Sequence, residues 1–170
     1  IHHMDKAAKL DANNPQVLEY SVLLYVKHQQ PEKALTTFRK AIKNDPENTQ
    51  LRRMYVQIAL RHQPEEARKE LNYLLNQTPD DDYLLFNLAL VNIELENYPE
   101  ARLQLQRISQ LQPNNSTALY YLGIIDYYDG KPEKALATFN RINEGPEYAQ
   151  AQEHMVRIHL ELEQYKEALH

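Results

Sequence analysis

The sequence has 170 residues, of which 42% are hydrophobic and 25% charged, with a net charge of −5. Nucleic-acid-binding proteins usually carry an excess of basic residues, which this acidic chain lacks, so no nucleic-acid partner is expected. The absence of cysteine excludes disulfides, thiolate metal sites and cysteine nucleophiles, and no apolar run reaches the roughly 18–20 residues of a membrane span.

Two markers recur along the chain with one period. The first is an alanine that follows Pro-Glu or Lys-Glu, and its spacings are 33, 34, 34 and 33 residues: Ala34, Ala67, Ala101, Ala135 and Ala168. The second is a proline with spacings of 33, 34 and 33 residues: Pro46, Pro79, Pro113 and Pro146. A shared period of this length indicates stacked structural repeats.

In chain order, residues 1–14 are predicted to end a preceding repeat, and residues 1–4 resemble the end of a histidine tag followed by a cloning scar. Four full repeats are predicted at 15–47, 48–81, 82–115 and 116–148, each made of two helices. Residues 149–170 are predicted to form a hairpin that is cut inside its second helix. The chain is therefore expected to be a fragment of a longer array.

The fourth repeat illustrates the pattern. Ser116 is predicted to cap a first helix, which Asp129-Gly130 ends. Pro132 suits the first turn of a second helix, because its missing N–H costs nothing there. The second helix is predicted to be ended by Gly145-Pro146. Its inner face is expected to carry Ala135, Phe139 and Ile142, and the inner face of the first helix Leu119, Leu122, Gly123 and Ile125.

These residues resemble the tetratricopeptide repeat (TPR) family over essentially the whole chain. The family pattern places large, large, small and aromatic residues on the first helix, then Ala, aromatic, Ala and Pro on the second. The resemblance implies an all-α, right-handed superhelical solenoid of antiparallel helix hairpins. Two departures predict a local irregularity in the second repeat: Arg52 occupies the usual tryptophan or leucine position, and the turn around Arg61–Pro64 is one residue short.

The residues of common active sites are missing. Three glycines cannot build a phosphate-binding loop, and no serine lies in a nucleophile motif. His154 and His159 are five residues apart, so they point to different faces of a helix and do not form a zinc-binding pair. No catalytic residue, metal or cofactor is therefore predicted, and the protein is not expected to be an enzyme.

A partner-binding surface is predicted instead on the first helices, which line a concave groove in the TPR family. Positions 2, 5, 9 and 12 of each repeat face this groove by resemblance. In the middle repeats they form an apolar, aromatic strip: Tyr83, Phe86, Leu90, Tyr120, Ile124 and Tyr127. Arg53 and Arg157 are expected to meet carboxylates of a partner. The family's chaperone-binding carboxylate clamp is absent, because Phe86 and Leu90 replace its Lys and Asn.

Two alternatives remain open for this strip: another segment of the same longer protein covers it, or positions 9 and 12 are packing residues between neighbouring repeats. The leading hypothesis is a scaffold or adaptor that binds a peptide or a partner protein. The alternative function is a structural segment whose groove is filled by its own chain. Residues 86–170 carry 7 basic and 12 acidic side chains, against 12 and 12 in residues 1–85, which favours a basic or neutral partner for the second half.

A finer resemblance involves Gly145-Pro146-Glu147-Tyr148, which is similar to a turn in proteobacterial TPR lipoproteins of the outer membrane. It implies a bacterial protein in the periplasm or anchored to the outer membrane. Self-association through the cut ends is also expected, because Met155, Ile158 and Leu162 belong to a hairpin that lacks its full second helix.

Overall fold

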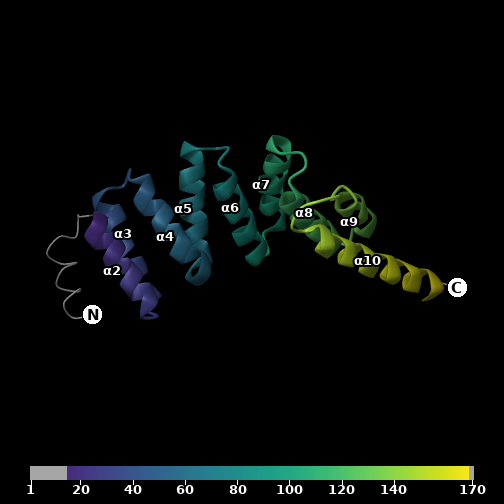
Figure 1. Ribbon diagram of the computed structural model, residues 1–170, viewed down its shortest axis with the longest axis horizontal. Helices are drawn as coiled ribbons and strands as arrows, with labels where there is room; N and C mark the ends of the chain where they lie inside the picture. Colours follow the sequence, from purple (N-terminus) through teal and green to yellow (C-terminus); the bar gives the residue numbers. More distant parts are fainter. Residues whose placement is uncertain (1–14, 169–170) are drawn as a thin grey trace. The chain divides into compact units, whose positions relative to one another are not determined.

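The computed structural model describes residues 15–168, and every regular element in this range is an α-helix (Figure 1). Nine helices, α2 to α10, follow one another along these residues. The predicted all-α helical repeat fold is therefore confirmed for the described part of the chain. Residues 1–14, predicted to end a preceding repeat, lie outside the described residues, as do residues 169–170.

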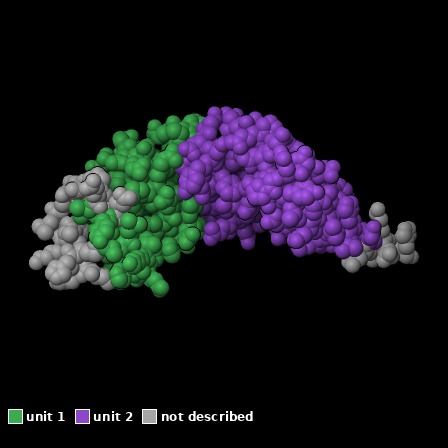
Figure 2. Space-filling model, viewed as in Figure 1, with its two compact units in different colours: residues 1–79 green, residues 80–170 purple. Residues whose placement is uncertain are grey.

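The chain divides into two compact units, residues 1–79 and residues 80–170 (Figure 2). The described helices of the first unit are α2 (Pro15–Lys27), α3 (Pro31–Asn44), α4 (Thr49–His62) and α5 (Pro64–Gln77), and each packs on the next. Their buried side chains recur at helical spacing, as in α3, where Ala34, Leu35, Phe38 and Ala41 face inward. The stripe of apolar residues on each helix is what the neighbouring helices cover.

The expected irregularity of the second repeat is visible between α4 and α5. A single residue, Gln63, joins the two helices and serves as the C-cap of one and the N-cap of the other. Its N–H donates to the carbonyl of Ala59 at 2.7 Å, and its own carbonyl accepts from the N–H of Ala67 at 3.0 Å. Helix α5 begins at Pro64, directly after Gln63. A proline suits this position because the first helical turn leaves backbone N–H groups unpaired and proline has none.

Arg52 is accommodated by polar contacts at a position where the family has a large apolar residue. Its guanidinium lies 3.8 Å from the centroid of the Tyr73 ring. It donates twice to the Pro46 carbonyl, at 3.0 and 2.8 Å, and forms an ion pair with Glu70. These charge-assisted hydrogen bonds and the ring stacking compensate for removing the guanidinium from water, so the departure stays local.

The second unit contains five helices: α6 (Asp82–Glu94), α7 (Tyr98–Leu111), α8 (Ser116–Tyr128), α9 (Pro132–Phe139) and α10 (Tyr148–Ala168). The N-cap of α8 is Asn115 and not Ser116, as the sequence had suggested; the Asn115 side chain accepts from the N–H of Ala118 at 2.9 Å. Asp81 caps α6 in the same way. Both oxygens satisfy amide groups that the first helical turn leaves unpaired.

Two predicted helix boundaries in this unit are wrong. Helix α9 ends at Phe139, before Ile142, although Ile142 is still buried after the following turn. The segment predicted as a hairpin at 149–170 is one continuous helix, α10, as far as the described residues reach. Around Gln164 the sequence offers no glycine or proline to interrupt a helix, and its Leu, Glu, Gln, Lys and Ala residues are good helix formers.

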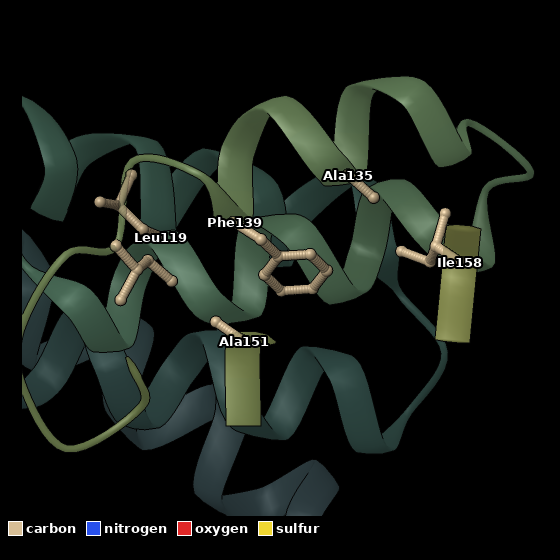
Figure 3. Packing of buried hydrophobic residues seen from close by; sticks show 6 residues of the cluster. Leu119, Ala135, Phe139, Ala151 and Ile158 are labelled. Carbon is tan, nitrogen blue, oxygen red and sulfur yellow. The ribbon is translucent and has the colours of Figure 1, made fainter. Parts of the chain in front are cut away.

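A cluster of buried side chains joins α8, α9 and α10 around Phe139 (Figure 3). Leu119 comes from α8, Ala135 from α9, and Ala151 and Ile158 from α10. Gly123 of α8 faces the ring of Phe139 so closely that a Cβ there would lie 2.5 Å from the ring atom Cε1. The small residue of the repeat pattern is therefore needed for the close approach of α8 and α9.

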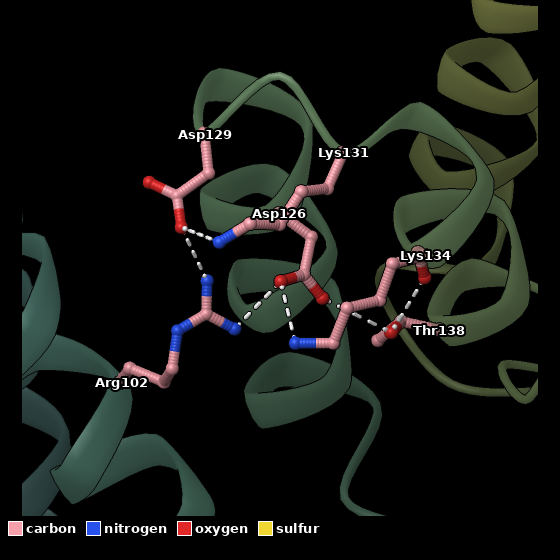
Figure 4. A network of polar contacts seen from close by, with 6 residues as sticks. All are labelled: Arg102, Asp126, Asp129, Lys131, Lys134 and Thr138. Atoms are coloured by element: carbon pink, nitrogen blue, oxygen red, sulfur yellow. Dashed lines mark hydrogen bonds and ion pairs between the residues drawn. The ribbon is translucent and has the colours of Figure 1, made fainter.

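A polar network links α7 with α8 and α9 (Figure 4). Asp126 is buried, and its carboxylate accepts from Arg102 at 2.6 Å and from Lys134 at 3.0 Å. Arg102 also pairs with Asp129 at 2.9 Å, and Lys131 pairs with the same carboxylate at 3.1 Å. The hydrogen bond from Lys131, followed by the contact with Arg102, lowers the pKa of Asp129 below its ordinary value.

Candidate functional site: the aromatic face of the second unit

Tyr83 and Phe86 of α6 line a pocket of about 260 Å³ in the second unit. Its other walls come from α6, α7 and the start of α8: Asp82, Ile108, Asn115 and Thr117. Tyr83 is 49% exposed, whereas Phe86 is half-buried. Tyr83 and Phe86 belong to the predicted strip, and their exposed ring surface can be contacted by another molecule.

The ring of Phe86 contacts that of Tyr121, the residue after Tyr120 on α8. The centroids of Phe86 and Tyr121 are 5.7 Å apart, with an edge-to-face angle of 63°. Tyr121 in turn meets Tyr120 at 5.5 Å and 81°. Such edge-to-face pairs are favourable arrangements of aromatic rings. Tyr121 was missed because it lies at position 6 of its repeat, which the aromatic strip left out.

Tyr120, Ile124 and Tyr127 of α8 are half-buried and pack against the cluster formed with α9 and α10. The Tyr127 hydroxyl donates to the Glu161 carboxylate at 2.8 Å, and this hydrogen bond is the main reason that the pKa of Tyr127 is raised. Burial similarly raises the pKa of Tyr120. For these three residues the arrangement favours the alternative in which they are packing residues between neighbouring repeats.

Tyr120 also contacts His154 of α10. The hydroxyl lies 3.2 Å from the imidazole Nε2, and the His154 ring stacks on Phe139 at 5.6 Å and 15°. Burial, then the positive charge of Arg157, lowers the pKa of His154. His154 therefore packs as an aromatic ring between α8, α9 and α10.

The remaining predicted site residues are more dispersed. Leu90 is half-buried on α6, and Arg157 is exposed on α10, where its charge acts on Tyr120 and Tyr127. Arg53 lies on α4, in the first unit, and is half-buried. A second pocket, of about 510 Å³, lies between the end of α8 and α10 and includes Tyr127, Tyr128 and Leu162 in its lining.

The site offers aromatic and apolar surfaces for contact. Among the described residues there is no group of three or more His, Cys, Asp and Glu side chains placed to hold a metal ion. No helix in that part of the chain is both long and apolar enough to cross a membrane. Stacked helical hairpins with aromatic side chains on their first helices define a helical-repeat protein.

Comparison with known families assigns this repeat. A model described as the TT21 fifth ARM repeats domain matches residues 52–160, and one described as Tetratricopeptide repeat matches residues 21–63. The chain belongs to the tetratricopeptide repeat family, as the sequence pattern had indicated.

Curated relatives match over short stretches. A protein described as Protein SGT1 homolog from Bos taurus is 34% identical over 91 residues, which are 54% of this chain and 27% of the relative. Protein O-mannosyl-transferase TMTC3 from Homo sapiens is 27% identical over 137 residues, 77% of this chain and 15% of the relative. The chain thus spans only about a quarter of the first relative's length and less of the second.

Solved structures show the same fold. A crystal structure of MamA protein has a TM-score of 0.76 and 17% identity, covering 94% of this chain and 87% of that one. The structure of YrrB, described as a TPR protein with an unusual peptide-binding site, has a TM-score of 0.68 and 24% identity, covering 81% and 72%. At these identities the likeness is one of fold.

Proposed function

We propose that this chain is a protein–protein interaction scaffold and that it binds an extended segment of a partner protein on the second unit. The contact surface is the α6–α8 aromatic patch, formed by Tyr83, Phe86 and Tyr121. The observation that carries the proposal is the exposure of Tyr83 beside a pocket that Phe86 also lines. Aromatic side chains next to a concavity are the usual anchors of a protein interface, because they bury a large area with little loss of side-chain freedom.

The patch differs from the rest of the predicted strip. Tyr120, Ile124 and Tyr127 contact α9 and α10, so their rings and methyl groups already contribute to the stability of the second unit. Tyr83 has no such role in the cluster and keeps about half of its surface open. The proposed binding site is therefore smaller than the sequence suggested and is centred on α6.

A protein of the same fold also favours a peptide as the ligand, since the YrrB structure is described as containing a peptide-binding site. The second candidate function is a structural segment whose first helices are covered by the protein's own chain. At one end of the strip, Tyr120 and Tyr127 already pack on α10 of the neighbouring repeat and are not open to either occupant. The two candidates differ in whether Tyr83 contacts a second molecule.

Site-specific photo-crosslinking separates the two. A benzophenone amino acid at Tyr83 is compared with the same group at Leu103, which is 63% exposed on α7 and outside the patch. Under the proposal, Tyr83 crosslinks to a protein that Leu103 does not reach. Crosslinks from Tyr83 only to the protein's own chain would support the second candidate.

The affinity of the captured partner then tests the patch. Tyr83→Ala with Phe86→Ala should weaken binding by at least ~2 kcal/mol, the scale of an interface hot spot, whereas Leu103→Ala should leave it unchanged. Thermal melting is the control for folding: Leu122→Ala, at a buried position of α8, should cost about 2–5 kcal/mol. A double variant that melts as low as Leu122→Ala would assign the patch to the core.

A further inference from the structure

We propose that the pocket of about 260 Å³ beside Tyr83 and Phe86, the α6–α8 pocket, binds a lysine or arginine side chain of the partner segment, so that the second unit selects basic peptides. This inference rests on the proposed function and adds the chemical class of the partner. Three observations carry it: the composition of the pocket wall, a second carboxylate held beside it, and the charge of the whole unit.

The pocket wall combines two aromatic rings with a carboxylate. Tyr83 and Phe86 follow Asp82 on the first turns of α6, and all three line the pocket. The face of an aromatic ring attracts a cation placed within about 6 Å, and the carboxylate supplies a full opposite charge. A lysine or arginine stem would cover the rings while its charged end reaches Asp82.

Asp82 is available for this role because the side chain that contacts its carboxylate, Gln112, is neutral. It accepts a hydrogen bond from the amide of Gln112. The neighbouring Asp80, in contrast, forms an ion pair with Arg107 at 2.7 Å. Other cations of the unit are also engaged with aspartates, as Arg102 is with Asp126 and Asp129. A peptide cation at Asp82 would therefore not have to displace an ion pair.

A second carboxylate lies behind the wall formed by Thr117. The Thr117 hydroxyl donates to Oε1 of Glu147 at 2.7 Å, and the Ser116 hydroxyl donates to Oε2 at 2.6 Å. Glu147 is held there by the turn before α10, in which Gly145 has a φ of +100° and a Cβ would come within 2.4 Å of the Ser116 Oγ. The Gly145-Pro146-Glu147 turn thus keeps a negative charge next to the pocket.

The charge of the unit acts in the same direction. Residues 80–170 carry 7 basic and 15 acidic side chains, a net charge of −8, whereas residues 1–79 carry 12 basic and 9 acidic ones, a net charge of +3. The two values sum to the −5 of the whole chain. An excess of one sign on a unit raises the local concentration of ligands of the opposite sign and speeds their association.

The test starts from random dodecapeptides displayed on phage and selected on the wild-type chain, with counter-selection on the Tyr83→Ala, Phe86→Ala variant. The selected peptides should share a lysine or arginine beside an apolar residue. The best of them is then synthesised with that cation replaced by glutamine, and its affinity is measured by fluorescence anisotropy. The replacement should weaken binding to the wild type by about tenfold or more, as expected for a lost charge-assisted hydrogen bond.

The protein variants locate the effect. In Asp82→Asn, the lysine or arginine peptide and its glutamine form should bind almost equally, because the carboxylate that distinguishes them is gone. The matched control is Glu100→Gln, which removes a carboxylate from the first turn of α7 and should leave the tenfold difference intact. Wild-type binding should also weaken with added salt.

The outcomes distinguish this inference from the proposed function. Two results would overturn the proposal that the pocket binds a cation and leave the scaffold proposal standing. The selected peptides could depend on Phe86 but be neutral or acidic, or they could bind Asp82→Asn as tightly as the wild type. A selection that yields no peptide, or only peptides that bind the Tyr83→Ala, Phe86→Ala variant equally well, would overturn both.

Discussion

Replacing Gly123 by alanine tests the packing of the second unit, because two known effects oppose each other at this position. Alanine is favoured over glycine in a helix by about 0.8–1.0 kcal/mol. The new methyl group, however, would lie 2.5 Å from Cε1 and 2.8 Å from Cδ1 and Cζ of Phe139. Carbon atoms in normal contact are about 3.5–4.0 Å apart, so the ring has to move.

The surroundings of Phe139 leave it little room. The side chain is fully buried, the His154 ring stacks on it at 5.6 Å, and the Tyr120 ring lies 5.9 Å away. Overpacking of a core typically costs about 1–3 kcal/mol. After the gain in helix preference is subtracted, Gly123→Ala should lower the free energy of unfolding by about 1 kcal/mol, which lowers the melting temperature of a unit of this size by about 4–8 °C.

Urea and thermal unfolding followed by far-UV circular dichroism measure this loss. Ala137→Gly, at an exposed position of α9, calibrates the helix-preference term without a packing change. Replacing the Phe139 ring with the smaller side chain of leucine should leave room for the alanine at position 123. The two changes together should therefore lower the free energy of unfolding by less than the sum of their separate effects. A Gly123→Ala protein that is more stable than the parent would refute the reasoning, since it would show that Phe139 yields without cost.

Two further predictions concern the polar groups of the same unit. Asp126→Ala should lower the free energy of unfolding by about 1.5–3 kcal/mol, because it removes hydrogen bonds to charged Arg102 and Lys134. In urea titrations Asp126→Asn should lose less of this free energy. Equal stability of Asp126→Ala and the parent would contradict the role of the network. The lowered pKa of His154 means that the folded state binds its proton less readily than the unfolded chain, so stability should fall as the pH drops through about 6.5 and continue to fall until the folded histidine is protonated. His154→Phe keeps the stacking and should flatten melting temperature against pH in this range, whereas parallel curves for the two proteins would count against it.

The sequence alone determined the class of fold and the starts of several helices. Apolar residues at helical spacing act locally, and so do the prolines shortly before the repeated alanines: a proline begins a helix wherever its missing N–H is harmless, as Pro31, Pro64 and Pro132 do. The short turn at Gln63 followed from counting residues. The sequence also predicted that Gly123 and Phe139 lie on the inner faces of the two helices of the fourth repeat, and the structure shows that the two are in contact.

Tertiary structure decided which members of the aromatic strip are open. Tyr83 and Tyr120 are both groove positions of the repeat, yet Tyr83 is 49% exposed whereas Tyr120 contacts Phe139 and His154. Whether such a ring is covered depends on side chains that lie more than ten residues away in the sequence, which no local pattern specifies. The same holds for Arg52, whose partners Pro46, Glu70 and Tyr73 come together only when α4 and α5 pack.

At the end of the second unit, too, the sequence determined some features and tertiary contacts the others. The sequence located the Gly145-Pro146-Glu147-Tyr148 turn, but the early end of α9 and the unbroken course of α10 depend on contacts across the unit. Glu147 is fixed by the Ser116 hydroxyl, 31 residues earlier, and Ile142 is buried without being helical. Local propensity predicts that a helix forms; where it ends, and which of its faces is covered, depends on the side chains that pack against it.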